Sequence, residues 1–288
     1  STICIFLIPV SNFRVQRYLN HSEGVYKPVN LCKFARFLMR FNHLILLFCL
    51  FGTRLSAQIN LNDSIVSAHI IQVDLGVGAP FGDMADRFGV HALVGGGYQY
   101  KTDENWLWGV NGAFIYGSVV REDSILNNLR NDAGFIIGLD GLQYDPILWE
   151  SGVNFKAEVG KITNIWGINP NSGLAFTGGV GFLQHRIWIY IDEAAVPQLA
   201  PTYRKGYDRL SNGIMLNQYI GYYLFSNKYF VNFRGGIEIQ EAFTQNRRSL
   251  NYDTGLPDDE MRFDMLVNLK LTWNLPIFEQ PRSKFYTH

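Results

Sequence analysis

From about residue 70 onward, apolar and polar side chains alternate with a period of two. In the segment 71–78 the apolar positions are Ile71, Val73, Leu75 and Val77, and polar or small residues lie between them. Successive side chains of a strand point to opposite faces of a sheet, so this period predicts a strand with one apolar face. The same alternation recurs in seven further segments, at 90–100, 106–116, 153–159, 174–182, 214–224, 231–239 and 263–273.

The lengths of these segments and of the connections between them indicate the kind of sheet. We expect strands of about 10 to 14 residues, which suits a tilted transmembrane strand better than the roughly 5–6 residues usual in soluble sheets. Short connections are expected at 101–105, 162–172 and 226–228, and long ones at 119–150, 188–212 and 242–261, with an intermediate one at 79–89. Short turns on one side and long loops on the other are typical of outer-membrane barrels.

The sequence therefore predicts an all-β fold, an eight-stranded antiparallel up-and-down transmembrane β-barrel with long extracellular loops. An even number of strands returns the chain to the side where it started, so both termini are expected in the periplasm. A soluble periplasmic β-protein with its apolar face turned inward remains the alternative. Within the connection 119–150, residues 125–130 are expected to form a short helical turn.

The first 57 residues are a different kind of sequence. Met39 and Arg40 precede the apolar run 44–51, and Ala57 closes a small-residue exit, which together predict a signal peptide over 39–57. The apolar run is too short for a helical membrane span of about 20 residues. Residues 1–38 are interpreted as an upstream extension or a mis-called start, 58–275 as the barrel and 276–288 as a short periplasmic tail. All three cysteines precede residue 58, so no disulfide is expected in the barrel.

Composition narrows the function classes. Basic and acidic residues balance at 25 each, which argues against a polybasic nucleic-acid binder and an acidic disordered chain. Aromatic residues make up 15% of the chain and glycine contributes 28 residues. Rings and glycines at these levels suit a sheet protein.

Charged residues fall on the polar faces of the predicted strands and are expected to point into the barrel. This predicted lumen network consists of Asp74, Lys156, Glu158, Arg234, Glu238, Asp264 and Lys270. Because charges in a dry interior persist only when paired, we expect ion pairs that close the lumen. A narrow polar channel is the functional alternative.

Aromatic residues gather where the strands meet the short turns. Five of them are expected to form a periplasmic aromatic girdle: Tyr98, Tyr100, Trp106, Trp108 and Trp273. Rings at one level are typical of the interface between a membrane and water.

Four stretches carry a resemblance to a known family, namely 181–185, 196–199, 205–210 and 273–277. With them the chain resembles uncharacterised outer-membrane β-barrel proteins of Bacteroidota, and more broadly the transmembrane barrel of outer membrane protein A. The resemblance implies the fold, an outer-membrane location in a Gram-negative bacterium, contact with membrane lipid and lipopolysaccharide, and insertion by the barrel-assembly machinery. It implies no established activity.

The predicted function is a structural or surface-interaction role, without catalysis or cofactor and with an extracellular partner that the sequence does not identify. The first alternative is a small pore or an accessory of transport or secretion. The second is a lipid-modifying enzyme that uses His91 or His185, although we expect both histidines to be structural. No metal-ligand spacing or phosphate-binding glycine loop is present in the sequence.

Overall fold

The structure, a computed structural model, describes residues 64–226 and 231–278. The predicted upstream extension and signal peptide lie outside these residues, as does most of the predicted tail. No helix within the described ranges is long and apolar enough to cross a membrane.

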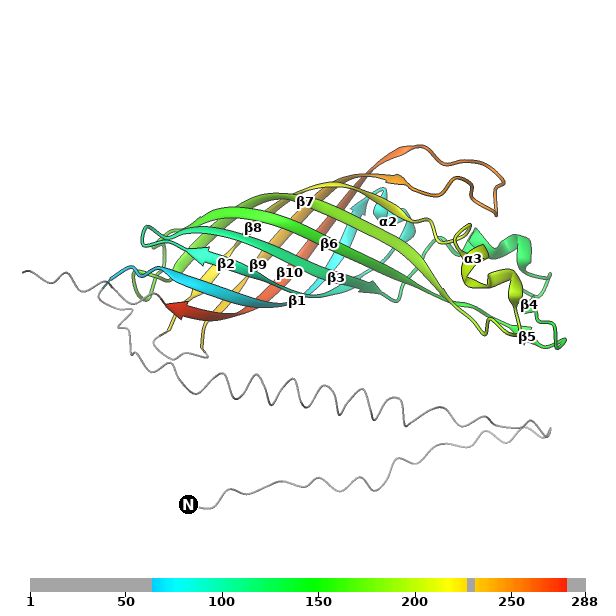
Figure 1. Cartoon of the computed structure of the whole chain (residues 1–288), viewed down its shortest axis with the longest axis horizontal. Coiled ribbons are helices and arrows are strands. Elements are labelled where there is room, and N and C mark those ends of the chain that lie inside the picture. The colour runs from blue at the N-terminus through cyan, green and yellow to red at the C-terminus, as the bar shows by residue number, and fades with distance from the viewer. Residues whose placement is uncertain (1–63, 227–230, 279–288) are drawn as a thin grey trace, which may run out of the picture. The chain divides into compact units, whose positions relative to one another are not determined.

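Eight long strands form one closed antiparallel barrel (Figure 1). The strands are β1 (Ala68–Gly82), β2 (His91–Lys101), β3 (Trp106–Gly117), β6 (Ile147–Ile162), β7 (Gly173–Tyr190), β8 (Ser211–Leu224), β9 (Phe233–Asn246) and β10 (Met261–Phe278). Each strand pairs with the next one along the chain, and β10 returns to pair with β1 from Phe278 beside Ala68 to Asp264 beside Gly82. The prediction of an eight-stranded up-and-down barrel is confirmed.

Closure follows from the pairing of the first strand on both of its sides. β1 pairs with β2 along one edge and with β10 along the other, so no long strand leaves a row of backbone N–H and C=O groups unpaired.

The connections between the strands alternate between the two ends of the barrel as predicted. The ends of strands joined by 102–105, by 163–172 and by the connection from β8 to β9 lie at one end of the barrel, called here the short-turn end. Connections 83–90, 118–146, 191–210 and 247–260 lie at the other end, the long-loop end.

Several strands run further than the sequence predicts. β1 continues to Gly82, β6 begins at Ile147, β7 continues to Tyr190 and β9 to Asn246, so all four long connections are shorter than expected. The reason is visible in β7, where Ile187 and Ile189 are fully buried beneath the loops. Apolar burial and continued pairing therefore extend the sheet beyond the expected strand ends.

The end of the barrel also lies further along the chain than residue 275. Strand β10 continues to Phe278, which pairs with Ala68, and Leu275 pairs with Ile71. Because β1 begins at Ala68, its first residues need partners from this part of β10. The described part of the predicted tail, 276–278, is thus strand.

Small elements occupy the long loops. They are α2 (Met84–Arg87), η1 (Asp123–Leu129), β4 (Ile136–Ile137), β5 (Gln143–Tyr144), η2 (Pro197–Leu199) and α3 (Pro201–Arg204). The 3-10 helix η1 confirms the helical turn expected near residues 125–130. In Figure 1, β4, β5 and α3 lie together beyond the ends of β6 and β7.

Two apolar clusters lie inside the barrel wall, toward opposite ends. At the long-loop end, Met84, Phe88, Ile125 and Leu126 from the loops pack with inward-facing strand residues such as Leu183. The cluster at the short-turn end consists of Ala68, Ile70, Leu107, Ile162, Ala175, Tyr223 and Phe225. The polar part of the interior lies between them.

Candidate functional site

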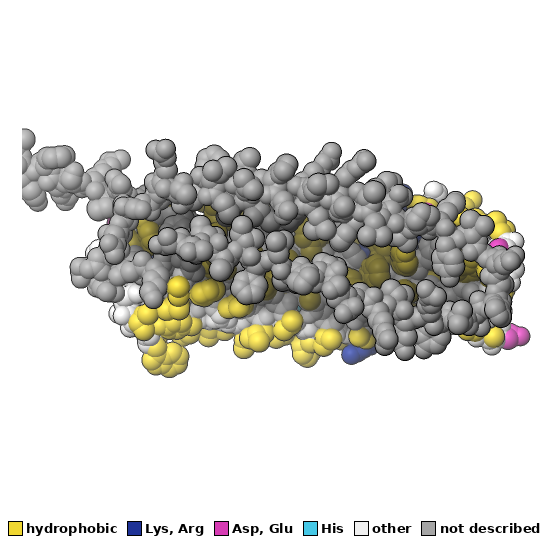
Figure 2. Space-filling model, turned by 90° about the horizontal axis from the view of Figure 1, so that it is seen from below, with side chains coloured by type: hydrophobic (Ala, Val, Ile, Leu, Met, Phe, Trp, Pro, Cys, Tyr) yellow, Lys and Arg dark blue, Asp and Glu magenta, His cyan; other side chains and the backbone are white. Residues whose placement is uncertain are grey.

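The two faces of the barrel wall have opposite character. On β1 the outward residue Val77 is 60% exposed, whereas the inward residue Asp74 is 1% exposed. Large exposed apolar side chains occur on all eight long strands, and the buried strand residues include charged and amide side chains. Where grey atoms do not cover the view, Figure 2 shows hydrophobic side chains along the wall. This is the polarity predicted for a barrel with its apolar face outward.

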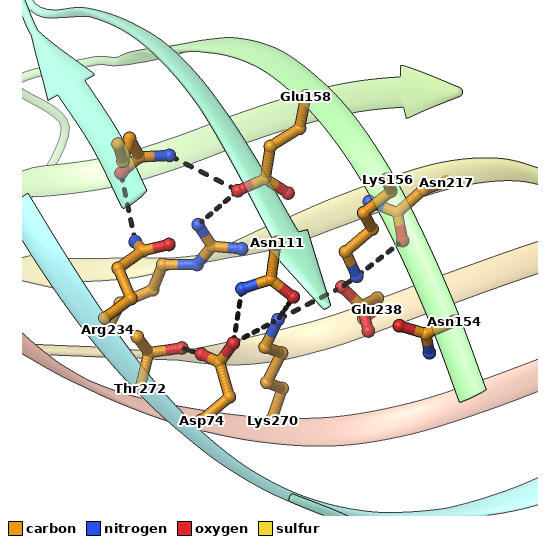
Figure 3. A network of polar contacts seen from close by, with 12 residues as sticks. Asp74, Asn111, Asn154, Lys156, Glu158, Asn217, Arg234, Glu238, Lys270 and Thr272 are labelled. Carbon is orange, nitrogen blue, oxygen red and sulfur yellow. Dashed lines mark hydrogen bonds and ion pairs between the residues drawn. The ribbon is translucent and has the colours of Figure 1, made fainter. Parts of the chain in front are cut away.

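The centre of the interior holds a chain of alternating charges (Figure 3). The Lys270 Nζ atom lies 3.2 Å from Asp74 Oδ2 and 3.5 Å from Glu238 Oε1. Glu238 also accepts a hydrogen bond from Lys156. Four predicted network residues from β1, β6, β9 and β10 are thus joined through their charges.

A second ion pair lies beside this chain. Arg234 Nη1 on β9 lies 3.2 Å from Glu158 Oε1 on β6, and it donates to the Tyr223 hydroxyl at 3.1 Å. The guanidinium also stacks over the Tyr219 ring, 3.9 Å from its centroid. A Cβ atom at Gly236 would lie 2.2 Å from the Ile220 carbonyl oxygen and 2.7 Å from the Tyr219 hydroxyl oxygen, so glycine at this position lets both the neighbouring strand and that ring approach.

Neutral side chains bind further atoms of Asp74, Lys156 and Glu238, whereas Glu158 Oε2 and Arg234 Nε and Nη2 are buried without a hydrogen-bonding partner among the described residues. Asp74 accepts hydrogen bonds of 2.5 Å from both Asn111 and Thr272. Asn217 accepts one from Lys156 at 3.3 Å, and Gln240 donates one to Glu238 at 2.9 Å. Three carboxylates and three cations are therefore held together with balanced formal charge, as a buried polar network requires.

The seventh predicted network residue lies apart from the other six. Asp264 Oδ2 accepts hydrogen bonds from His185 Nε2 at 2.8 Å and from Thr244 Oγ1 at 2.5 Å. Phe88 packs edge-on against the His185 ring. The other strand histidine on the polar face, His91, contacts Asn268 Oδ1 at 2.8 Å through Nε2. Both histidines are buried in the interior.

The five residues of the predicted girdle lie near the short-turn end. Tyr98 pairs with Ile71, Tyr100 with Trp108, and Trp273 with Val73, all near the ends of their strands. Tyr98, Trp106, Trp108 and Trp273 are exposed, and Tyr100 is half-buried. All five come from β2, β3 and β10, and their role as a girdle in contact with a membrane stays a prediction.

Sequence reasoning missed a second aromatic group at the other end of the barrel wall. Trp149 stacks on Tyr190 with ring centroids 6.1 Å apart, and it lies 5.9 Å from the Tyr116 ring. The sequence predicts that Trp149 lies in the connection 119–150 and Tyr190 in the connection 188–212. The sequence predicts that Tyr116 lies on the apolar face of a strand. Its position at the end of that strand was the one signal that could have indicated the second aromatic group.

Sequence reasoning also missed a buried carboxyl group. Glu150 is fully buried in β6, and neither carboxyl oxygen has a hydrogen-bonding partner among the described residues. The sequence pattern predicts instead that Glu150 is the last residue of the long connection 119–150. Among residues 64–226 and 231–278, no group of three or more His, Cys, Asp or Glu side chains is arranged to hold a metal ion.

Comparison with known proteins gives structural likenesses alone. Neither a protein-family profile nor a curated protein sequence matches the chain. Neisserial surface protein A has a TM-score of 0.35 at 10% identity, covering 71% of this chain and 96% of that one. Ail of Yersinia pestis, solved with the heparin analogue sucrose octasulfate, has a TM-score of 0.34 at 9% identity, covering 73% and 98%. OprG of Pseudomonas aeruginosa has a TM-score of 0.30 at 9% identity, covering 75% and 99%. The fold assignment rests on the strand pairing of the chain itself.

Proposed function

We propose that this protein is an integral outer-membrane β-barrel of a Gram-negative bacterium with a structural or surface-interaction role. The observation that carries the proposal is the apolar outer face found on all eight long strands, around a charged and hydrogen-bonded interior. Water would favour the reverse arrangement, because exposed apolar surface costs free energy in proportion to its area. A hydrocarbon surrounding removes that cost, and the closed barrel leaves no backbone edge exposed to it.

The height of the apolar wall supports the same proposal. On β3, Tyr116 follows Trp106 by ten residues on the same outward face. Ten residues span about 33 Å along a strand at roughly 3.3 Å per residue. A strand tilted by about 40° covers roughly 25 Å of the barrel axis over that length, which matches the height of an outer-membrane apolar band of about 25 Å. The two aromatic groups would then lie at the two interfaces.

The proposed orientation has the long-loop end outside the cell and the short-turn end, with both termini, in the periplasm. It is supported by the asymmetry of the connections, since outer-membrane barrels have short periplasmic turns. The proposed partners are membrane lipid, lipopolysaccharide at the outer rim and, during insertion, the barrel-assembly machinery. Kinship with Bacteroidota barrels remains part of the proposal.

The interior supports a structural role over a pore. The ion pairs fill the centre, and apolar clusters lie toward each end. An eight-stranded barrel has room for little more than its own side chains. The alternative, a small pore or transport accessory, is supported by the polarity of the lumen alone.

A non-catalytic role is also proposed. His185 and His91 lie inside the wall and are bound to Asp264 and Asn268, so a lipid on the outer surface would not reach them. Ser211, which pairs with His185 in the sheet, donates to the Arg209 carbonyl oxygen and accepts from Arg87. Its hydroxyl is committed to bonds other than one with the histidine.

Fractionation of cells expressing the full chain tests location and orientation. The proposal predicts that the protein stays with the outer membrane after a sodium carbonate wash. A protease added to intact cells should cut within 118–146 or 247–260 and spare the turn 163–172. Release by carbonate would instead identify a soluble periplasmic protein, and cutting at the turn alone would reverse the orientation.

A further inference from the structure

A polar cavity of about 520 Å³ opens at the long-loop end of the barrel. Connections 83–90, 118–146, 191–210 and 247–260 all contribute to its lining, together with the first residues of β10. Its volume lies within the range of small-molecule sites, which is about 300–1,000 Å³. The lumen network lies deeper in the barrel, so this cavity is a separate feature.

The floor of the cavity is rich in guanidinium groups. Arg87 and Arg209 are buried and Arg262 is half-buried, and the carboxylates of Glu122 and Asp258 lie among them. The floor therefore holds three cations and two of the carboxylates that line the cavity. Arg209 is already paired with two carboxylates, because it binds Glu122 at 2.9 Å and both oxygens of Asp253.

Arg262 retains binding capacity, whereas Arg87 already donates to Ser211 through Nη1 and lies 3.5 Å from Glu122 Oε2 through Nε. Arg262 donates to Asp258 through Nη2, whereas its Nη1 is buried and has no hydrogen-bonding partner among the described residues. Burial, and after it the neighbouring guanidinium of Arg262, lowers the pKa of Arg87. A carboxylate or phosphate between these two neighbouring guanidiniums would be stabilised by both positive charges and would accept a hydrogen bond from the unused Nη1 of Arg262.

The mouth of the cavity carries the opposite charge. Asp83, Asp86 and Glu260 are exposed there, against one exposed cation, Arg121. Arg121 is bound to the Ala85 carbonyl oxygen at 2.6 Å. Glu122 contributes a further acceptor deeper in the cavity, since its Oε2 atom has no hydrogen bond and lies 3.5 Å from Arg87 Nε. A purely anionic ligand would meet repulsion at this acidic mouth.

We propose that this cavity binds a small zwitterion, with its carboxylate or phosphate on Arg87 and Arg262 and its ammonium group at the acidic mouth. The arrangement of charge in two layers selects this class over a simple anion or a simple cation. A peptide-like molecule and a phosphoethanolamine headgroup share this chemistry. The inference does not depend on the membrane proposal, because it rests on the loops and on Arg262 at the start of β10.

Isothermal titration of the full chain, purified in detergent from expressing cells, tests the proposal. The probes are glycylglycine and O-phosphoethanolamine, with inorganic phosphate and ethanolamine as ligands of one charge. We expect at least one zwitterion to bind about tenfold more tightly than either single-charge ligand. Which of the two binds identifies the source as peptide-like or headgroup-like. Absence of binding by both, or phosphate binding as tightly as either, would overturn the proposal.

Variants locate the site. Arg262→Gln should weaken zwitterion binding at least about tenfold, because it removes a charge-assisted donor. The pair Asp86→Asn and Glu260→Gln should weaken zwitterion binding but not phosphate binding, which should stay the same or become tighter because repulsion at the mouth is removed. Arg247→Gln, an exposed arginine bound to Asn212 outside the cavity, is the matched control and should bind like the natural protein.

Folding is checked separately for each variant by the electrophoretic mobility of unheated samples. If Arg262→Gln does not fold, the exposed pair Asp86→Asn and Glu260→Gln still decides the matter. Glu260 is 80% exposed and lies 3.9 Å from Arg262 Nη2, and Asp258 keeps its two shorter bonds to that atom in the pair variant. Unchanged zwitterion affinity in that folded pair would contradict the proposal even if the barrel itself is intact.

Discussion

Arg234 on β9 and Glu158 on β6 form an ion pair of 3.2 Å across the barrel interior, and each side chain is 1% exposed. Their strands are separated in the sheet by β7 and β8, so the contact spans the lumen rather than following the wall. Together with the lysines of the network it fixes the distance between opposite walls. The proposal that the lumen is closed rests on this ion pair and on the lysines of the network.

Replacement of Glu158 by Gln should destabilise the barrel, because it leaves Arg234 buried without its carboxylate. We expect the free energy of unfolding to fall by about 3–5 kcal/mol. Denaturant unfolding in detergent micelles measures it. The control is Arg204→Gln, which breaks the more exposed loop pair with Glu193 and should cost no more than about 1 kcal/mol. Equal losses in the two variants would contradict the network's role.

The lumen should not conduct. Below the network, Phe225 stacks on Tyr223 with ring centroids 5.6 Å apart, inside the apolar cluster at the short-turn end. We therefore expect no discrete current steps from the protein in planar lipid bilayers. Regular steps whose size changes in Arg234→Gln would support the pore alternative instead.

A charge on the outer wall should be costly only where lipid surrounds it. Val110 lies midway along β3 and is 45% exposed, while Val119 lies beyond the end of β3 and is 44% exposed. Val110→Arg should lower the free energy of unfolding in lipid vesicles by about 2–4 kcal/mol, and Val119→Arg by no more than about 1 kcal/mol. The matched exposure excludes burial as the cause. Similar effects at the two positions would argue for a water-exposed wall.

Acid should loosen the loop 247–260. Burial raises the pKa of Asp258, but hydrogen bonds from Arg262 and Asn246 outweigh it and hold this pKa below its ordinary value. The stabilisation is therefore complete above the ordinary aspartate pKa of about 3.9 and is lost as the pH falls through the lower folded value. A spin label at Thr254→Cys should gain mobility below about pH 4.

The same label provides a control for this acid transition. In Asp258→Asn its mobility should be high already at neutral pH and change little on acidification. The predicted barrel contains no other cysteine, which makes the labelling specific. A label that stays immobile down to about pH 3 in the natural sequence would contradict the assignment.

The strands could be predicted from the sequence because their signal is local. A period of two is present within each segment, and the parity of that period places Asp74 or Lys270 on the inner face whatever the partner strand is. The pairs could not be predicted. Arg234 lies 76 residues from Glu158, and their contact depends on how the closed sheet is staggered.

The ends of β6 and β7 could not be predicted because the face that carries the apolar side chains changes there from the outer to the inner one. Along most of β7 the apolar side chains point outward, as Phe182 does, but beyond His185 the buried residues are Ile187 and Ile189. There the apolar side points inward beneath the loops, as in a water-soluble domain. The cavity is still less predictable, since it needs residues from all four long loops.

The electrophoretic mobility of the detergent-solubilised protein, unheated against boiled, tests the central claim most directly. The account predicts that the unheated sample needs detergent to stay in solution and migrates differently from the boiled sample, because a closed barrel with its network resists unfolding until heated. A chain that is soluble without detergent and shows one mobility under both conditions would contradict the account, and the apolar wall would then need another explanation.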